Sequence, residues 1–215
     1  MINLPTKQEC MHLIKVTYRM PQNIIDHSIQ VNKVAVFLAM KLKEKGIDVN
    51  LDLVDRASIL HDIMKMIEID PIRGLIFPDN KAFTISKKDR LIWMDMKKRY
   101  SHLTHEEAAY KIFKEKYPEM ALIIKKHGYT NLEGENKLNT IEEKLVHYAD
   151  KRVSHSNIVP MKERLEEGHK RYKEKNLLKG IDEEFIQKVD KELFELEKEI
   201  FNKLDFEPNS LPEIM

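Results

Sequence analysis

The sequence predicts an all-α fold, and three observations support that prediction. Apolar residues recur three and four positions apart along most of the chain, which is the spacing of one face of a helix. Only 6 glycines and 8 prolines occur among the 215 residues, so few positions interrupt a helix. No stretch shows a convincing alternation of apolar and polar residues of the kind that predicts a strand.

Several helices are predicted before the C-terminal region. Ser86, Thr104 and Thr140 each precede an acidic residue by three positions, which is the capping-box spacing that begins a helix. Pro118 suits the first turn of a helix, and Gly128 suits a helix end. The predicted helices span roughly residues 22–45, 51–66, 86–98, 104–116, 118–128 and 140–152.

Two regions depart from this regular pattern. Pro71, Gly74 and Pro78 break the stretch after the second helix, so we expect an irregular excursion there. A polar connector follows the helix that ends near Arg152, and an irregular tail covers residues 205–215. Between them lies a long amphipathic helix with apolar residues at steps of three and four: Phe185, Val189, Leu193, Leu196 and Ile200.

Composition and charge limit the classes of partner. A formal net charge of +1 gives no general electrostatic attraction to nucleic acid or to an anionic membrane. The basic run 169–175 is short and contains an acidic residue, so we interpret it as a solvated connector. Neither a signal peptide nor a membrane-spanning segment is predicted. With Cys10 as its single cysteine, the chain has no intrachain disulfide, and we expect it in the reducing cytoplasm.

Polar residues fall on the apolar faces of five predicted helices. A single histidine in such a place is usually a hydrogen-bonded core residue, but an unpaired buried carboxylate is very costly. Two carboxylates and four histidines in one small core cannot easily satisfy one another, whereas a bound cation satisfies all of them. The inward residues are His27, His61, Asp62, His105, His127 and Asp150.

This donor set indicates a divalent metal. Imidazole and carboxylate suit Mn, Fe, Co, Zn, Ni or Mg, and no set of thiolates is present to favour a structural zinc site. His61 and Asp62 are adjacent, so on a helix their side chains project about 100° apart and can reach the same ion.

The pattern resembles the HD superfamily of metal-dependent phosphohydrolases. Such proteins have a histidine on one helix, a His-Asp doublet on the next and a distant aspartate, and here these are His27, His61-Asp62 and Asp150. The resemblance covers roughly residues 22–155. It implies an all-α HD-domain helical bundle that hydrolyses phosphate esters, with these residues holding one ion.

The resemblance also implies a second ion. His105 and His127 fall where dinuclear members place further ligands, with Asp62 as the bridge between two ions. Fe or Mn is favoured. His102 is a rival to His105, but it precedes the predicted cap at Thr104 and lacks apolar partners at helical spacing.

Lys65 completes an HD-x-x-K pattern, and members with that pattern use the lysine near the substrate phosphate. Asp62 and Lys65 are the expected catalytic residues, and Lys151 and Arg152 are expected to join Lys65 in binding the phosphate. In the mechanism that the resemblance implies, a metal-bound hydroxide attacks the phosphorus of the substrate. Met64 departs from the glycine that many relatives have before the lysine, so the substrates of those relatives do not transfer.

The expected division of the chain follows from the resemblance. Residues 1–165 form the HD-domain core, and the insert 67–100 covers the site. Residues 166–215 hold the connector, the long helix and the tail, packed on the core or on the second subunit of a homodimer. Within the insert, Arg73, Trp93 and Arg99 could meet a substrate, but Trp93 in the core and the arginines on the surface are the favoured interpretation.

Several functions stay open at this point. The favoured one is hydrolysis of a phosphate ester of a nucleotide or a similar small molecule. A mononuclear nucleotidase would dispense with His105 and His127. A non-catalytic regulatory module would bind metal and nucleotide without turnover, and a nuclease is disfavoured because no broad basic groove is apparent.

Overall fold

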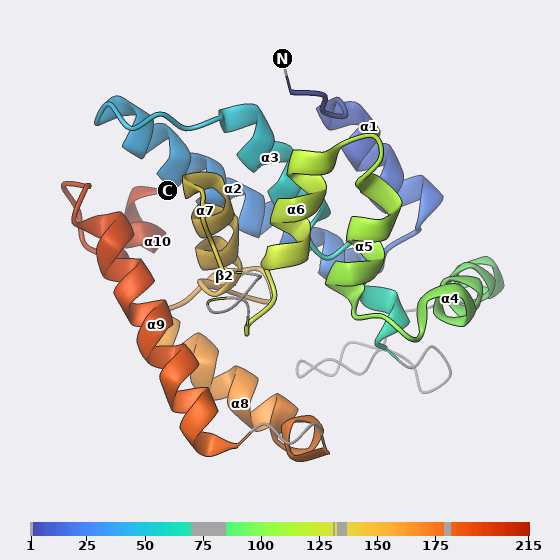
Figure 1. The fold of residues 1–215 in the computed structure, drawn as a ribbon. Coiled ribbons are helices and arrows are strands. Elements are labelled where there is room, and N and C mark those ends of the chain that lie inside the picture. The colour runs from blue at the N-terminus through green and yellow to red at the C-terminus, as the bar shows by residue number, and fades with distance from the viewer. Residues whose placement is uncertain (1, 70–84, 131, 133–136, 179–181) are drawn as a thin grey trace.

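The computed structural model is all-α, as predicted, and describes residues 2–69, 85–130, 132, 137–178 and 182–215 (Figure 1). In the N-terminal half, α1 (Lys7–His12) continues into a π-helical turn, η1 (Leu13–Thr17), before the long α2 (Gln22–Glu44) and α3 (Leu51–Leu60). A 3₁₀ turn, η2 (Lys65–Ile67), follows α3. In the described residues no helix is both long and apolar enough to cross a bilayer.

The middle of the chain supplies four helices of the bundle. They are α4 (Lys87–Tyr100), α5 (His105–Phe113), α6 (Pro118–Lys126) and α7 (Ile141–Asp150). The predicted capping boxes at Ser86, Thr104 and Thr140 are all present, and Pro118 occupies the first turn of α6. These local signals fix where α4 to α7 begin, and so they fix the positions of the polar residues near the helix ends.

The core is formed by α2, α3, α5, α6 and α7. Helix α3 packs against α2, α6 and α7, while α5 packs on α6, and α4 packs on η2 at the edge of the bundle. Leu38 and Leu42 of α2, Leu60 of α3 and Ile124 of α6 are fully buried in the shared core. The arrangement brings the C-terminal ends of α3, α6 and α7 toward one another.

The C-terminal region contains more regular structure than predicted. A two-stranded antiparallel hairpin, β1 (Val153–Ser154) and β2 (Asn157–Ile158), follows α7. The described part of the expected polar connector lies largely in α8 (Met161–Leu178), and the expected irregular tail contains η4 (Pro208–Ser210) and α10 (Leu211–Ile214). The prediction missed α8 because its first half has only two apolar residues, Met161 and Leu165, which are buried. Charged pairs one turn apart, such as Glu167–Arg171, also support the helix.

The long amphipathic helix is α9 (Glu183–Phe201), and it packs on α7 within the same chain. Val189, Leu193, Leu196 and Ile200 of its predicted apolar stripe are buried, while Phe185 is only partly covered. Figure 1 shows α8 and α9 on the opposite side of the bundle from α4. The homodimer and the proposed division at residue 165 stay predictions.

Candidate metal centre

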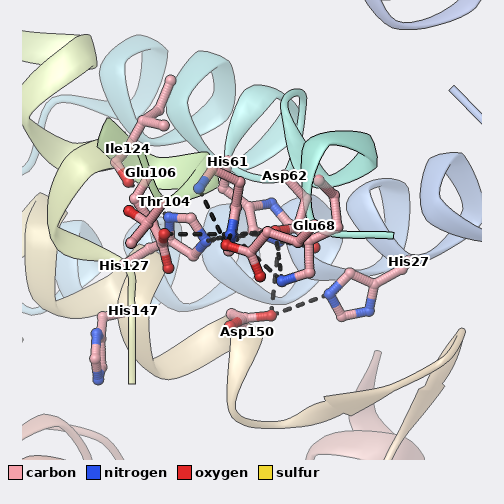
Figure 2. A network of polar contacts seen from close by, with 12 residues as sticks. His27, His61, Asp62, Glu68, Thr104, Glu106, Ile124, His127, His147 and Asp150 are labelled. Carbon is pink, nitrogen blue, oxygen red and sulfur yellow. Dashed lines mark hydrogen bonds and ion pairs between the residues drawn. The ribbon is translucent and has the colours of Figure 1, made fainter. Parts of the chain in front are cut away.

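The six inward side chains meet in one cluster where the core helices converge. Figure 2 shows this cluster from close by and labels all of the six except His105. His27 projects from the second turn of α2, and His61 and Asp62 follow directly after α3. His105 is the first residue of α5, His127 follows the last residue of α6, and Asp150 is the last residue of α7. All except His27 are buried, and the His27 side chain is 13% exposed.

One half of the cluster is organised around Asp150. Its Oδ1 atom lies 3.0 Å from Nε2 of His27 and 3.6 Å from Nε2 of His61. The three ligand atoms of this group lie close enough to one another to hold a single ion.

The other half is organised around Asp62, whose two oxygens face different histidines. Oδ1 lies 3.0 Å from Nε2 of His105 and 3.5 Å from Nε2 of His127. Oδ2 lies 3.7 Å from Nε2 of His61, which also belongs to the Asp150 half. The carboxylate of Asp62 therefore stands between the two halves.

Every histidine of the cluster has its Nδ1 atom against a hydrogen-bond acceptor. His61 donates to the carbonyl of Ser58 at 2.8 Å, and His127 donates to the carbonyl of Ile124 at 2.6 Å. The other two Nδ1 contacts are His27 with the carbonyl of His155 at 3.0 Å and His105 with Oε1 of Glu68 at 2.8 Å.

A neutral histidine that donates from Nδ1 carries its lone pair on Nε2. In that neutral form the four Nε2 lone pairs point at the acceptor oxygens of Asp62 and Asp150. Two of these buried atoms, Nε2 of His61 and Oδ1 of Asp62, have no hydrogen-bond partner in the described part of the chain. Acceptors that face acceptors in a buried site fit divalent cations, and Nδ1 bonds to fixed acceptors are typical of metal-binding histidines.

The His-Asp doublet does not lie in mid-helix, and this corrects the prediction that the helix continues to residue 66. The last α-helical residue is Leu60, and the next turns have i→i+3 bonds such as Ile63 N to Leu60 O. The imidazole of His61 takes the Ser58 carbonyl, which in a continuing helix would accept from the amide of Asp62. His127 does the same with Ile124 at the end of α6, so two helix C-termini are capped by inward histidines.

Electrostatics of the cluster follow from its burial and its carboxylates. Burial disfavours the protonated form of His61, but Asp62 and Asp150 outweigh it and raise the pKa. The pKa of His105 is raised to about 9, since Glu106, Asp62 and Glu68 outweigh burial and Lys65. Burial and the neighbouring histidines instead lower the pKa of His127.

Burial also opposes ionisation of Asp62 and Asp150, but adjacent cations hold the pKa of each carboxyl well below its usual range. Lys65 has the largest lowering effect on Asp62, and Lys151 has the largest on Asp150. Both aspartates are therefore carboxylates at neutral pH.

Of the three cationic residues expected to bind phosphate, Lys65 alone lies at the edge of the cluster. Its Nζ is 3.3 Å from Nε2 of His105 and 3.4 Å from Oδ1 of Asp62, and its side chain is 25% exposed. Lys151 is buried beneath Asp150. The structure does not bring Arg152 to the cluster: it is fully buried and donates to Tyr148, Glu197, Val159 and Pro208.

The remaining candidates lie outside the cluster. His102 is exposed in the turn before α5, so His105 is the histidine that the structure brings in. Trp93 is a core residue that donates from Nε1 to the carbonyl of Tyr18, and Arg99 pairs with Asp95 on the surface. Met64 is fully buried in the hydrophobic core. Arg73 lies outside the described residues.

Sequence reasoning missed two carboxylates beside His105. Oε1 of Glu68 accepts from both Nδ1 and the backbone amide of His105, and Oε2 of Glu106 lies 3.2 Å from the same Nδ1. His105, Glu106 and His127 form a further group able to hold an ion. Glu106 could have been found as the neighbour of a ligand candidate, but no local pattern relates Glu68 to His105.

These features define an all-α protein with a buried His/Asp cluster able to hold divalent metal. Residues 24–154 match the model of the HD domain family, and the chain belongs to that family, a superfamily of metal-dependent phosphohydrolases.

One curated relative is the dihydroneopterin 2',3'-cyclic phosphate phosphodiesterase of Methanocaldococcus jannaschii. It is 31% identical over 147 residues, which are 67% of this chain and 51% of the relative. The chain therefore spans about half the length of this relative. The comparison with solved structures gave no match.

Proposed function

We propose that this protein hydrolyses a phosphate ester of a nucleotide or a similar small molecule with the help of two divalent ions, Fe or Mn. The observation that carries the proposal is the set of four Nε2 lone pairs directed at two carboxylates in a buried cluster. If no cation is bound and no imidazole takes up a proton, acceptors face acceptors there at a high cost in free energy. Nitrogen and oxygen donors without thiolates favour Fe or Mn over a structural zinc.

The proposed roles follow from the distances. One ion would be held by His27, His61, Asp150 and Oδ2 of Asp62. The other would be held by His105, His127 and Oδ1 of Asp62. When bound, such ions supply Lewis acidity that activates a water molecule and offsets the charge of a phosphate.

The other residues prepare the cluster for this chemistry. Glu68 holds the ring of His105 through Nδ1, so the lone pair of Nε2 faces inward. The carbonyls of Ser58, Ile124 and His155 do the same for the other three histidines. Lys65 reaches the edge of the cluster on a flexible, partly exposed chain, where its ammonium can contact a phosphate oxygen.

The relative's printed name suggests where to begin with substrates. It acts on a cyclic phosphate diester of a pterin, so a small cyclic phosphodiester is the first class to test, beside nucleotide monoesters and dinucleoside polyphosphates. The partner of the site is then a small phosphorylated molecule.

The test uses full-length protein stripped with chelator and reloaded with Mn²⁺ or, without oxygen, Fe²⁺. Product formation from a 2',3'-cyclic nucleotide, a nucleoside monophosphate and a dinucleoside polyphosphate is followed by chromatography. We expect metal-dependent turnover of at least one of them, and loss of that turnover in Asp62→Asn. Asp26→Asn is a matched control, since it makes the same change at an exposed position beside His27.

Two outcomes would contradict the proposal. If turnover is the same with and without metal, the cluster does not work as a metal centre. If the metal-loaded protein binds nucleotide tightly but turns over none of the three classes, a non-catalytic binding module is favoured instead.

A further inference from the structure

Lys151 is one of the few buried ammonium groups in the described chain, and its Nζ contacts two residues of the cluster. The residue is 6% exposed, follows the last residue of α7, and adopts the C-cap position of that helix. Its Nζ lies 2.5 Å from Oδ2 of Asp150 and 3.1 Å from the backbone carbonyl of His127. One ammonium therefore contacts a residue from each half of the cluster.

The contact between Lys151 and Asp150 determines which partner each oxygen of the Asp150 carboxylate faces. Oδ2 accepts from Lys151, so the planar group turns Oδ1 toward Nε2 of His27 and His61. If the ammonium were removed, the carboxylate could rotate and present either oxygen, or neither, to the histidines. A buried carboxylate with one fixed oxygen is preorganised to offer the other to a cation.

The contact with His127 acts on the backbone. His127 follows the last residue of α6, and its ring already donates from Nδ1 to the carbonyl of Ile124. The ammonium of Lys151 donates to the backbone carbonyl of His127, and this bond joins the ends of α6 and α7. Cations are favourable at helix C-termini, where carbonyl groups lack helical partners.

From these contacts we propose that Lys151 is a positioning residue that couples the two halves of the metal cluster, and that it does not contact substrate. Desolvation of an ammonium is costly, and here it is offset by a carboxylate and a carbonyl that both belong to residues of the cluster. The proposal rests on the proposed metal-binding function. It revises the expectation that Lys151 binds the phosphate.

The chain offers a close control for the loss of a buried ammonium. Lys126 is 4% exposed and donates from Nζ to Glu143 and to the carbonyl of Lys137, each at 2.9 Å. Its Nζ is therefore paired with a carboxylate and a carbonyl, as in Lys151, but neither partner belongs to the cluster. Lys126→Met and Lys151→Met remove the same group from equivalent surroundings.

The experiment titrates Mn²⁺ into chelator-treated wild type, Lys151→Met and Lys126→Met by calorimetry, with circular dichroism to verify folding. We expect Lys151→Met to bind Mn²⁺ about 10–100-fold more weakly than wild type, which is the usual effect of removing a group that orients metal ligands. Lys126→Met should bind Mn²⁺ as the wild type does. In steady-state kinetics at saturating Mn²⁺, Lys151→Met should lower kcat and leave KM unchanged.

If Lys151→Met does not fold, Lys151→Gln carries the test, because its amide can still donate to one of the two acceptors. Unchanged Mn²⁺ affinity in either folded variant would overturn the inference. Unchanged affinity with a raised KM would show a substrate contact instead. If the wild type itself binds no Mn²⁺, the proposed function fails, and this result is distinct from equal binding by wild type and variant.

Discussion

Glu68 provides a sharp test of how the His105 side of the cluster is built. Its Oε1 atom accepts from Nδ1 of His105 at 2.8 Å and from the backbone amide of the same residue at 3.1 Å. Glu68→Ala removes both bonds. The bond to Nδ1 is the one that orients the ring of His105, and a hydrogen bond to a charged acceptor contributes about 1.5–3 kcal/mol.

The Glu68 side chain is 22% exposed, so water partly replaces the lost acceptor. We therefore expect a loss of about 2 kcal/mol in metal binding, which is about 30-fold in affinity. Glu68→Gln keeps an oxygen that can accept from Nδ1 and should lose less. The assay is calorimetric titration of the chelator-treated protein with Mn²⁺.

Glu142→Ala is the matched control for this series. Oε1 of Glu142 accepts from the backbone amide of Asn50 at 2.8 Å, at the opposite end of α7 from Asp150. It should leave Mn²⁺ affinity unchanged. Wild-type affinity in folded Glu68→Ala would refute the reasoning that the Nδ1 partner of His105 orients the ring.

Three further predictions follow from the same geometry. His105→Ala or His127→Ala should each lower the bound metal by about one ion per chain and abolish turnover, whereas retained turnover would favour a mononuclear enzyme. The pKa of His105 is raised from 6.5 to about 9 in the metal-free cluster, so Mn²⁺ binding at pH 8 should release protons. Calorimetry would detect this release, because the measured binding enthalpy would then differ between buffers of different ionisation enthalpy. Arg152→Met should lower the free energy of unfolding by about 3–5 kcal/mol in urea titrations, because it removes the fully buried guanidinium that pairs with the Glu197 carboxylate and donates to the carbonyls of Val159 and Pro208.

Each of these has an opposing result. A raised folded-state pKa stabilises the metal-free protein fully below pH 6.5, and that contribution is lost as the pH rises toward 9. The chelator-treated protein should therefore lose stability between pH 6.5 and 9. Constant stability over this pH range, or equal Mn²⁺-binding enthalpies in all buffers, would contradict a protonated His105 in the metal-free cluster. For Arg152→Met, unchanged stability with a raised KM would identify Arg152 as a substrate contact after all.

The sequence predicts the members of the cluster because helical periodicity places each one on an apolar face. Ile24 precedes His27 by three residues, and Ile123 precedes His127 by four, and the structure buries both isoleucines and His127 in the core. A periodic pattern determines which way a side chain points from its helix. It therefore predicted correctly that side chains from distant segments meet.

The sequence does not predict where α3 ends. Apolar residues continue at helical spacing through Met64 and Ile67, so nothing local indicates a change to i→i+3 bonds after Leu60. At this point the Nδ1 atom of His61 donates to the backbone carbonyl of Ser58, in place of a backbone amide. Such competition between side chain and backbone depends on where the ring must point, and that is set by the other helices.

Contacts between distant segments account for the other omissions. Glu68 and His105 are separated by α4 and by part of the chain before it, so no spacing relates them. The β1–β2 hairpin is too short to show alternation, and its turn residue His155 has φ of 56°, a conformation that sequence patterns assign to glycine or asparagine. The carbonyl of that residue nonetheless holds His27.

The most direct test of the central claim is elemental analysis of metal per chain, on protein purified without chelators and without oxygen. The two halves around Asp150 and Asp62 predict about two ions per chain, Fe or Mn, and about one ion in His127→Ala. No bound metal, even after reconstitution with Mn²⁺ or Fe²⁺, would contradict the account of this cluster as a metal centre.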